Sequence, residues 1–396
     1  MQLAALEAIK TETDILLLSP TGSGKTLGFL LPVLTKLEKE KTGVQALVVV
    51  PSRELALQIE QVFKQMSTGY KVNCCYGGHS TRTEKHNLSH PPAVLVGTPG
   101  RIAYHINHAN FDTSEIHTLV LDEFDKALEL GFKNEMADII KPLKNLRRRI
   151  LTSATNMKEI PEFTGVKNPV ELNFLNSNSP TTTPLKLSYL HSTDTDKLQL
   201  LFALLCKLQN KSTLVFCNHR DAVERISILL EQKGIEHGIF HGGMEQEDRE
   251  RSLIKLRNGS HRLLVTTDLA SRGLDIPEIE AVIHYQLPPT EDVFTHRNGR
   301  TARMNADGIA CLLLSASDTL PSYIPETTEQ EALPDKNILP GKTIWRTLYI
   351  AAGKKEKINK MDIVGMLLQK GGLAKDERGL LEVLDIASYA AIRTSK

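Results

Sequence analysis

Short apolar runs recur along the first part of the chain, and each one ends at a polar or glycine-rich cluster. Such runs are typical of strands buried on both faces, and amphipathic segments that predict helices separate them. We expect strands at 15–18, 46–50, 74–76, 94–97, 118–121 and 149–152. Strands that alternate with helices predict an α/β fold with a parallel sheet covered on both faces. The first helix is expected at the amino end, where Leu3, Leu6 and Ile9 share one face.

The pattern stops at a polar, proline-bearing stretch and then restarts. Runs at 212–216, 262–265, 280–283 and 310–314 predict a second α/β domain of the same kind. We therefore expect two parallel-sheet domains, at 1–175 and 185–320, joined by a linker at 176–184. A second linker, acidic and poor in large apolar residues, is expected at 321–342.

Residues 343–396 differ in character and predict a small α+β module. Strands are expected at 347–350, 380–384 and 389–392, with a basic turn at 354–360 and a helix at 362–368. Lysine and arginine exceed the acids here. That excess fits a binding patch or a solvated charged face equally well.

Length, apolar runs, cysteines and net charge limit the classes of protein to which this chain can belong. The 396 residues are too many for one ordinary core, and no apolar run approaches the 18–20 residues that span a bilayer. The five cysteines are scattered without a CxxC pair, which favours reduced thiols in a cytoplasmic protein over disulfides or a zinc site. A formal net charge of +1 means that any nucleic-acid binding depends on local placement of charge.

Every polar cluster in the first domain follows a predicted strand. In parallel sheets, ligands bind beyond the carboxyl ends of the strands. This shared position predicts one site built from several motifs, and it is stronger evidence than any single motif.

The stretch Ser19–Thr26 (SPTGSGKT) is a P-loop pattern between an apolar strand and a helix. Gly22 and Gly24 let backbone N–H groups point at phosphate oxygens, and the helix start adds a positive end. Lys25 can reach the β- and γ-phosphates, and the Thr26 hydroxyl can hold Mg²⁺. An ordinary glycine-rich turn is the alternative.

Two further clusters supply what phosphate hydrolysis needs. Asp122 follows a buried strand, where it can hold Mg²⁺, and Glu123 can deprotonate the attacking water. Arg297, Arg300 and Arg303 are spaced by three, which predicts one helix face. Of these, Arg300 and Arg303 are candidate arginine fingers from the second domain. A polar strand end and an exposed arginine-rich helix are the alternatives.

Taken together, the motifs resemble those of DEAD-box RNA helicases. The similar segments are 19–26 (motif I), 51–56 (Ia), 77–78 (GG), 98–101 (Ib), 122–125 (DEFD, where the family usually has DEAD), 153–155 (III), 215–218 (IV), Gln246 with Arg249 (QxxR), 266–268 with 272–275 (V) and 296–303 (VI). Departures from the usual pattern are Ser52, Phe124 and Ala302. The part of the family's Q motif that precedes its glutamine would lie before Met1.

This resemblance implies two RecA-like domains and a role for each matching residue. Gln2 would read adenine, Asp275 would contact the ribose or γ-phosphate region, and residues Thr21, Gly22, Ser23, Gly24, Lys25 and Thr26 would bind the nucleotide. Ser153 and Thr155 would couple Asp125 to motif VI, which includes His296. The RNA backbone would contact Arg53, Gly78, Thr98, Arg101, Gly243, Arg249 and Thr266.

The tail at 348–355, 360–365 and 384–392 resembles the RNA-binding domain of DbpA-like bacterial helicases, a divergent RRM. In that family the domain anchors the helicase on structured ribosomal RNA. The module is expected to be partial, because the last helix and strand of an RRM would follow its third strand.

These features predict an RNA-dependent ATPase that uses ATP and Mg²⁺ to separate short RNA duplexes. We expect a cytoplasmic monomer with no membrane contact, acting on structured ribosomal RNA, with ribosomal precursor particles as further partners. The alternatives are an ATP-gated RNA clamp with weak hydrolysis and a DNA helicase or translocase on the same fold.

Overall fold

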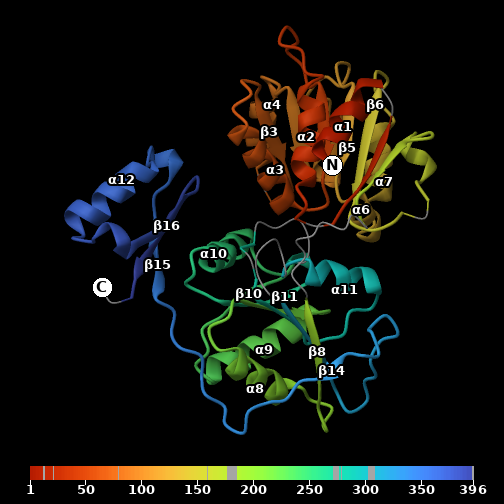
Figure 1. The fold of residues 1–396 in the computed structure, drawn as a ribbon. Helices are drawn as coiled ribbons and strands as arrows, with labels where there is room; N and C mark the ends of the chain where they lie inside the picture. The colour runs from red at the N-terminus through yellow and green to blue at the C-terminus, as the bar shows by residue number, and fades with distance from the viewer. Residues whose placement is uncertain are drawn as a thin grey trace. The chain divides into compact units, whose positions relative to one another are not determined.

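The computed structural model describes residues 1–11, 14–20, 22–78, 80–157, 159–175, 185–270, 276–277, 279–301 and 308–394. These residues form two compact units, which in the sequence come before and after residues 176–184; Figure 1 draws the fold of each. No helix in the described ranges is both long enough and apolar enough to cross a membrane.

The first unit is built on a seven-stranded sheet in which all neighbouring strands are parallel, in the order β3-β4-β2-β5-β6-β1-β7. Its strands are β1 (Ile15–Leu18), β2 (Ala46–Val49), β3 (Val72–Cys75), β4 (Val94–Gly97), β5 (Thr118–Leu121), β6 (Arg148–Ser153) and β7 (Val170–Asn173). Its helices are α1 (Gln2–Ala8), α2 (Lys25–Leu34), α3 (Arg53–Gln65), α4 (Thr81–Leu88), α5 (Pro99–Asn107), α6 (Phe124–Glu129) and α7 (Lys133–Ile140). The predicted parallel sheet is confirmed, and β7 is an addition to it.

Successive residues of each central strand enter two different cores. In β1, Ile15 and Leu17 pack with α2 and α3, while Leu16 and Leu18 pack with α5, α6 and α7. The strand is therefore buried on both faces, which explains why its sequence is continuously apolar rather than alternating.

The prediction for the first helix is wrong in part. Leu3 is 73% exposed, whereas Ala5 and Ile9 are buried. Because α1 ends at Ala8 and Ile9 begins a 3₁₀ turn, the inward face does not follow a single α-helical stripe.

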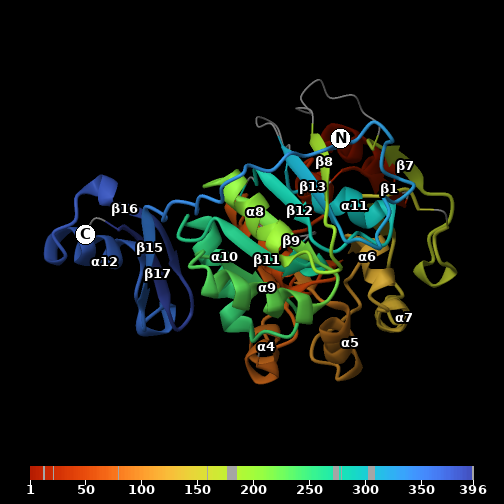
Figure 2. The same cartoon turned by 90° about the horizontal axis from the view of Figure 1, so that it is seen from below.

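The second unit contains another seven-stranded parallel sheet, in the order β10-β11-β9-β12-β13-β8-β14. Figure 2 shows its central strands β11, β9, β12, β13 and β8. Its strands are β8 (Lys186–His191), β9 (Thr213–Cys217), β10 (Gly238–Phe240), β11 (Leu263–Thr267), β12 (Ala281–His284), β13 (Ile309–Leu314) and β14 (Glu329–Gln330). Its helices are α8 (Leu198–Leu208), α9 (Arg220–Gln232), α10 (Gln246–Arg257) and α11 (Glu291–Asn298). The expected linker at 321–342 is corrected here, because β14 lies within it and pairs with β8.

The carboxyl-terminal module is an antiparallel sheet in the order β15-β17-β16, made of β15 (Trp345–Ile350), β16 (Arg378–Val383) and β17 (Ser388–Arg393). Helix α12 (Lys360–Gly365) covers one face, where Ile363 and Leu367 pack on Leu381 and Ala390. This confirms the small α+β module.

The same compact unit contains contacts between the module and α10. Asn258 Nδ2 donates to Thr347 Oγ1 at 2.9 Å, and Arg257 pairs with Glu382 at 3.3 Å. Ile254 packs against Tyr389. Helix α10 and the module therefore share polar and apolar contacts.

Candidate functional site

In the first unit, the predicted motifs meet at one edge of the sheet. Because all its strands are parallel, their carboxyl ends lie at the same edge. The residues that follow these ends, in sheet order from β3 to β1, are Tyr76, Thr98, Val50, Asp122, Ala154 and Ser19. The sheet thus brings together segments up to 135 positions apart.

The P-loop connects β1 to α2 and is shaped by two glycines. Gly22 and Gly24 have φ values of 81° and 86°, in the left-handed region that L side chains disfavour. Gly24 caps α2, so the positive end of this ten-residue helix begins at Lys25. Lys25 Nζ donates to the carbonyl of Ser19 at 2.8 Å, which folds the lysine over its own loop. Thr21 lies outside the described residues.

Gln2 contacts the P-loop directly. Its Nε2 atom lies 3.4 Å from the Gly24 carbonyl oxygen, and a Cβ atom added at Gly24 would come within 2.7 Å of that nitrogen. The predicted adenine reader is therefore beside the predicted phosphate site, and the left-handed φ of Gly24 disfavours a side chain at position 24.

The acidic pair follows β5. Asp122 is 4% exposed, and burial raises the pKa of its carboxyl, although a hydrogen bond from Thr152 and the charge of Lys25 act in the opposite direction. Glu123 has φ 48° and ψ 48°, a strained conformation for a residue with a side chain.

Thr152 of β6 is a residue of this site that sequence reasoning missed. Its hydroxyl donates to Asp122 Oδ1 and accepts from the Glu123 N–H at 3.2 Å. One hydroxyl thus holds both acidic residues. The sequence feature that could have pointed to Thr152 is its position directly before Ser153, at the end of a buried strand.

The predicted partners Asp125, Ser153 and Thr155 are also brought together. Thr155 Oγ1 donates to Asp125 Oδ2 at 2.9 Å, and Ser153 Oγ accepts from the Thr155 N–H at 3.0 Å. His296, their predicted coupling partner, is buried in α11 of the second unit.

The four predicted RNA contacts of the first unit follow β2, β3 and β4, which are adjacent strands. A Cβ atom at Gly78, where φ is 83°, would lie 2.7 Å from Arg53 Nη2, so the glycine lets the arginine approach. Thr98 precedes α5, and Arg101 lies in its first turn. These residues form a polar surface with two helix amino ends, an arrangement that suits phosphates.

The second unit places its three predicted RNA contacts differently. Gly243 is exposed after β10, and Arg249 is half-buried in the first turn of α10. Thr266 is fully buried, and its hydroxyl donates to the Phe240 carbonyl oxygen at 2.7 Å. Its side chain is therefore a sheet contact, which leaves only its main chain for a ligand.

The predicted arginine helix is wrong in its described part. Helix α11 ends at Asn298, and Arg300 lies beyond Gly299. Arg297 and Arg300 are 0% and 2% exposed, so they do not form a solvated helix face. Arg303 and Asp275 lie outside the described residues.

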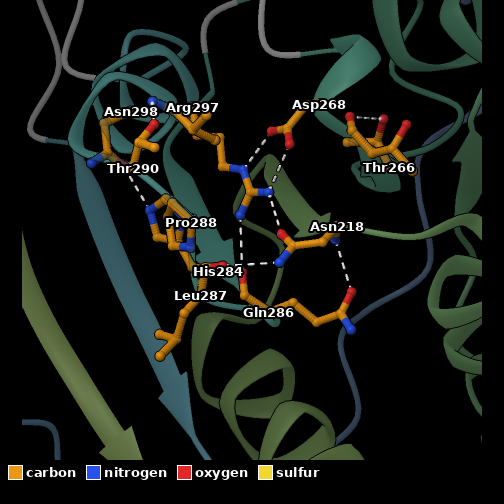
Figure 3. A network of polar contacts seen from close by, with 12 residues as sticks. Asn218, Thr266, Asp268, His284, Gln286, Leu287, Pro288, Thr290, Arg297 and Asn298 are labelled. Carbon is orange, nitrogen blue, oxygen red and sulfur yellow. Dashed lines mark hydrogen bonds and ion pairs between the residues drawn. The ribbon is translucent and has the colours of Figure 1, made fainter. Parts of the chain in front are cut away.

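Arg297 instead joins several segments of the second unit (Figure 3). It donates to Asp268 through Nε and Nη2, at 2.6 and 3.0 Å, and to Asn218 Oδ1 at 2.7 Å. Its Nη1 donates to the Gln286 carbonyl oxygen at 2.9 Å, and its guanidinium lies 5.3 Å from the Phe216 ring centroid. The ends of β9, β11 and β12 are therefore tied to α11 by one buried cation.

Comparisons with known proteins agree with this arrangement. The profile of the DEAD/DEAH box helicase family matches residues 1–163, that of the helicase conserved C-terminal domain matches residues 196–305, and that of the DbpA RNA binding domain matches residues 347–396. The ATP-dependent RNA helicase DbpA of Escherichia coli (strain K12) is 31% identical over 404 residues, covering 99% of this chain and 88% of the relative. The chain belongs to the DEAD-box family of ATP-dependent RNA helicases.

Two further similar proteins cover most of this chain. The ATP-dependent RNA helicase DbpA of Bacillus subtilis (strain 168) is 29% identical, covering 100% of this chain and 89% of the relative. The structure of S. cerevisiae Dbp5 bound to RNA and ADP BeF3 matches with a TM-score of 0.71 and 26% identity, covering 79% of this chain and 83% of that one. This DEAD-box helicase is thus an ATP hydrolase by family, with a DbpA-type RNA-binding module.

Proposed function

We propose that this chain is an RNA-dependent ATPase that locally separates short duplexes in structured ribosomal RNA. The observation that carries the proposal is the junction of Asp122, Glu123 and Thr152 beside the P-loop. A binding module that does not hydrolyse ATP has no need for a strained, buried acidic pair next to a phosphate-binding lysine.

At the nucleotide, Gly22, Ser23, Gly24 and Lys25 would hold the phosphates, and Gln2 would select adenine. Thr21 and Asp275 are proposed to complete this site from the family pattern. The donor set fits Mg²⁺, because Thr26 and Asp122 offer the oxygen ligands that this ion prefers and Asp122 is a buried carboxylate. Bound Mg²⁺ would offset negative charge on the phosphate oxygens.

For hydrolysis, Glu123 would orient and deprotonate the attacking water, and Lys25 would stabilise the transferring phosphoryl group. Arg300 and Arg303 would deliver positive charge from the second domain. Asp125, Ser153, Thr155 and His296 would link the acidic segment to motif VI when the domains close.

On the RNA, Arg53, Gly78, Thr98 and Arg101 would contact the backbone from the first domain. Gly243, Arg249 and Thr266 would do so from the second. Contacts to phosphate and sugar carry little sequence information, and the 2′-OH would favour RNA over DNA.

Selection of the target would fall to the carboxyl-terminal module. The match to the DbpA RNA binding domain supports ribosomal RNA, and so does its exposed basic segment, which contains Lys354, Lys355, Lys357 and Lys360. We also propose that the protein acts as a cytoplasmic monomer on ribosomal precursor particles. The five free cysteines support a reducing compartment.

The test is steady-state ATP hydrolysis by the full chain without nucleic acid, with a structured ribosomal RNA fragment, and with DNA of matched sequence. We expect strong stimulation by RNA alone, lost in Lys25→Ala and Glu123→Gln and kept in Glu129→Gln, which removes an exposed carboxylate from the neighbouring helix. RNA binding without hydrolysis would favour the clamp, and equal stimulation by DNA would favour the translocase.

A further inference from the structure

Glu84 is a buried carboxylate of the first unit that the proposed chemistry does not use. It projects inward from α4 and is 1% exposed, whereas Arg82 and Lys85 on the same helix are exposed. A carboxylate is buried at this depth only where partners compensate for its lost hydration.

The partners of Glu84 come from two elements that carry predicted RNA contacts. Oε1 accepts from the Tyr76 N–H at 3.0 Å, and Oε2 lies 2.8 Å from His105 Nε2 and 3.4 Å from Arg101 Nη1. Tyr76 directly precedes Gly77 and Gly78, while Arg101 and His105 lie one turn apart on α5. One carboxylate therefore bridges the loop after β3 and the helix after β4.

The orientation of His105 is defined by a further contact. Asn110 Nδ2 lies 2.9 Å from His105 Nδ1 and can donate to it. An Nδ1 atom that accepts leaves the N–H on Nε2, which makes Nε2 a donor to Glu84. The carboxylate then accepts from three donors.

The cluster also includes Cys75, and the ligand atoms of Cys75, Glu84 and His105 lie within 4.8 Å of one another. This spacing would suit a metal ion. However, burial raises the pKa of the Cys75 thiol to about 12, so the thiol is neutral and a poor ligand. Both Glu84 oxygens already accept hydrogen bonds, and these account for the geometry without a metal.

We propose that Glu84 is a positioning residue for RNA binding, which holds the Gly77–Gly78 loop and Arg101 in one fixed arrangement. The inference rests on the proposed function, because it takes Gly78 and Arg101 as RNA-backbone contacts. A carboxylate suits this task since it only accepts. An amide would turn an N–H group toward one of the three donors.

The first experiment measures ATP hydrolysis of full-length Glu84→Gln against RNA concentration. We expect the RNA concentration for half-maximal stimulation to rise about tenfold, because about tenfold in affinity corresponds to the loss of one charge-assisted contact. The KM for ATP without RNA should be unchanged, because the P-loop follows β1, and four strands separate β1 from β3 in the sheet order. Glu129→Gln is the matched control, and thermal unfolding reports on the fold.

A double-mutant cycle separates positioning from a merely structural role. If Glu84 acts in part through Arg101, adding Glu84→Gln to Arg101→Gln raises RNA half-saturation by clearly less than the tenfold expected for Glu84→Gln alone. Additive effects, or unchanged RNA half-saturation in a folded Glu84→Gln protein, would overturn the proposal.

Three further outcomes are decisive. If Glu84→Gln does not fold, Asn110→Ala is the variant to test, because it frees the His105 ring. We expect its RNA half-saturation to rise about two- to threefold, and an unchanged value would overturn the proposal.

If Arg101→Gln itself leaves RNA binding intact, the proposed RNA contact and this inference both fail. If Arg101→Gln weakens binding and Glu84→Gln does not, this inference alone fails.

Discussion

Arg297 and Asp268 form a bidentate ion pair in which both carboxylate oxygens accept from one fully buried guanidinium. The pair joins the last turn of α11 to the residue after β11. Lysine cannot reproduce it, because an ammonium group lacks the planar fork that also reaches Asn218 and Gln286. The segment that leads to Arg300 is therefore held by contacts of Arg297.

We predict that Arg297→Lys lowers the free energy of unfolding by about 3 kcal/mol, since it breaks a buried network. RNA-stimulated ATP hydrolysis should fall more than about tenfold, because the turn carrying Arg300 loses its support. Urea unfolding and steady-state kinetics measure the two effects. The control is Arg225→Lys at the exposed Arg225–Asp196 pair, for which a change within about 0.5 kcal/mol is expected. Equal stability of the two variants would contradict the structural role of Arg297.

We predict that Thr152→Val lowers kcat for ATP hydrolysis about 10- to 100-fold and changes the KM for ATP less. Valine has a similar shape but removes the hydroxyl that holds Asp122 and the Glu123 N–H. Thr152→Ser keeps the hydroxyl and should retain most of the rate. If the valine and serine variants hydrolyse ATP equally fast, the hydroxyl does not position the acidic pair.

We predict that Phe124→Ala destabilises the first unit by about 3–5 kcal/mol. Phe124 is fully buried in the core beneath α6, with its ring centroid 6.3 Å from that of Phe163. Thermal unfolding of the full chain measures the loss, and Leu130→Ala at a half-exposed position is the control. If Phe124→Ala is as stable as Leu130→Ala, the prediction is wrong. The core would then close over the missing ring, and the alanine that the family usually has at this position would be enough to fill it.

Acid should destabilise the second unit through His284. Burial lowers the pKa of His284 to about 3, whereas the unfolded chain takes up this proton near pH 6.5. The contribution of His284 to the free energy of unfolding is therefore complete above about pH 6.5. It falls as the pH drops toward 3, and about 2 kcal/mol of it is lost at pH 5.

The variant His284→Gln tests this dependence, because its amide can still donate to Asn298 as His284 Nε2 does. The loss of unfolding free energy between pH 7.5 and pH 5 should be smaller in the variant by about 2 kcal/mol. Burial also lowers the pKa of His261, to about 4, so some acid sensitivity remains in both proteins. An equal loss in parent and variant would contradict the assignment.

Much of the architecture followed from the sequence alone, because local patterns encode it. Continuous apolar runs such as Ile15–Leu18 predicted strands buried on both faces, and the structure confirms them. The P-loop glycines were recognisable because only a residue without a side chain adopts their backbone angles freely. The grouping of motifs at strand ends followed from one rule about parallel sheets.

Tertiary structure alone decided which polar residues meet. Thr152 and Glu84 lie in none of the recognised motifs, and the motif that contains Arg297 does not predict its contacts. The partners of these three residues lie 8 to 79 positions away in the chain. Hydrogen bonds over such separations depend on strand order and on burial, neither of which has a local signature. The exposed Leu3, the end of α11 at Asn298 and the strand β14 were misjudged for the same reason: packing against the rest of the unit overrides local pattern.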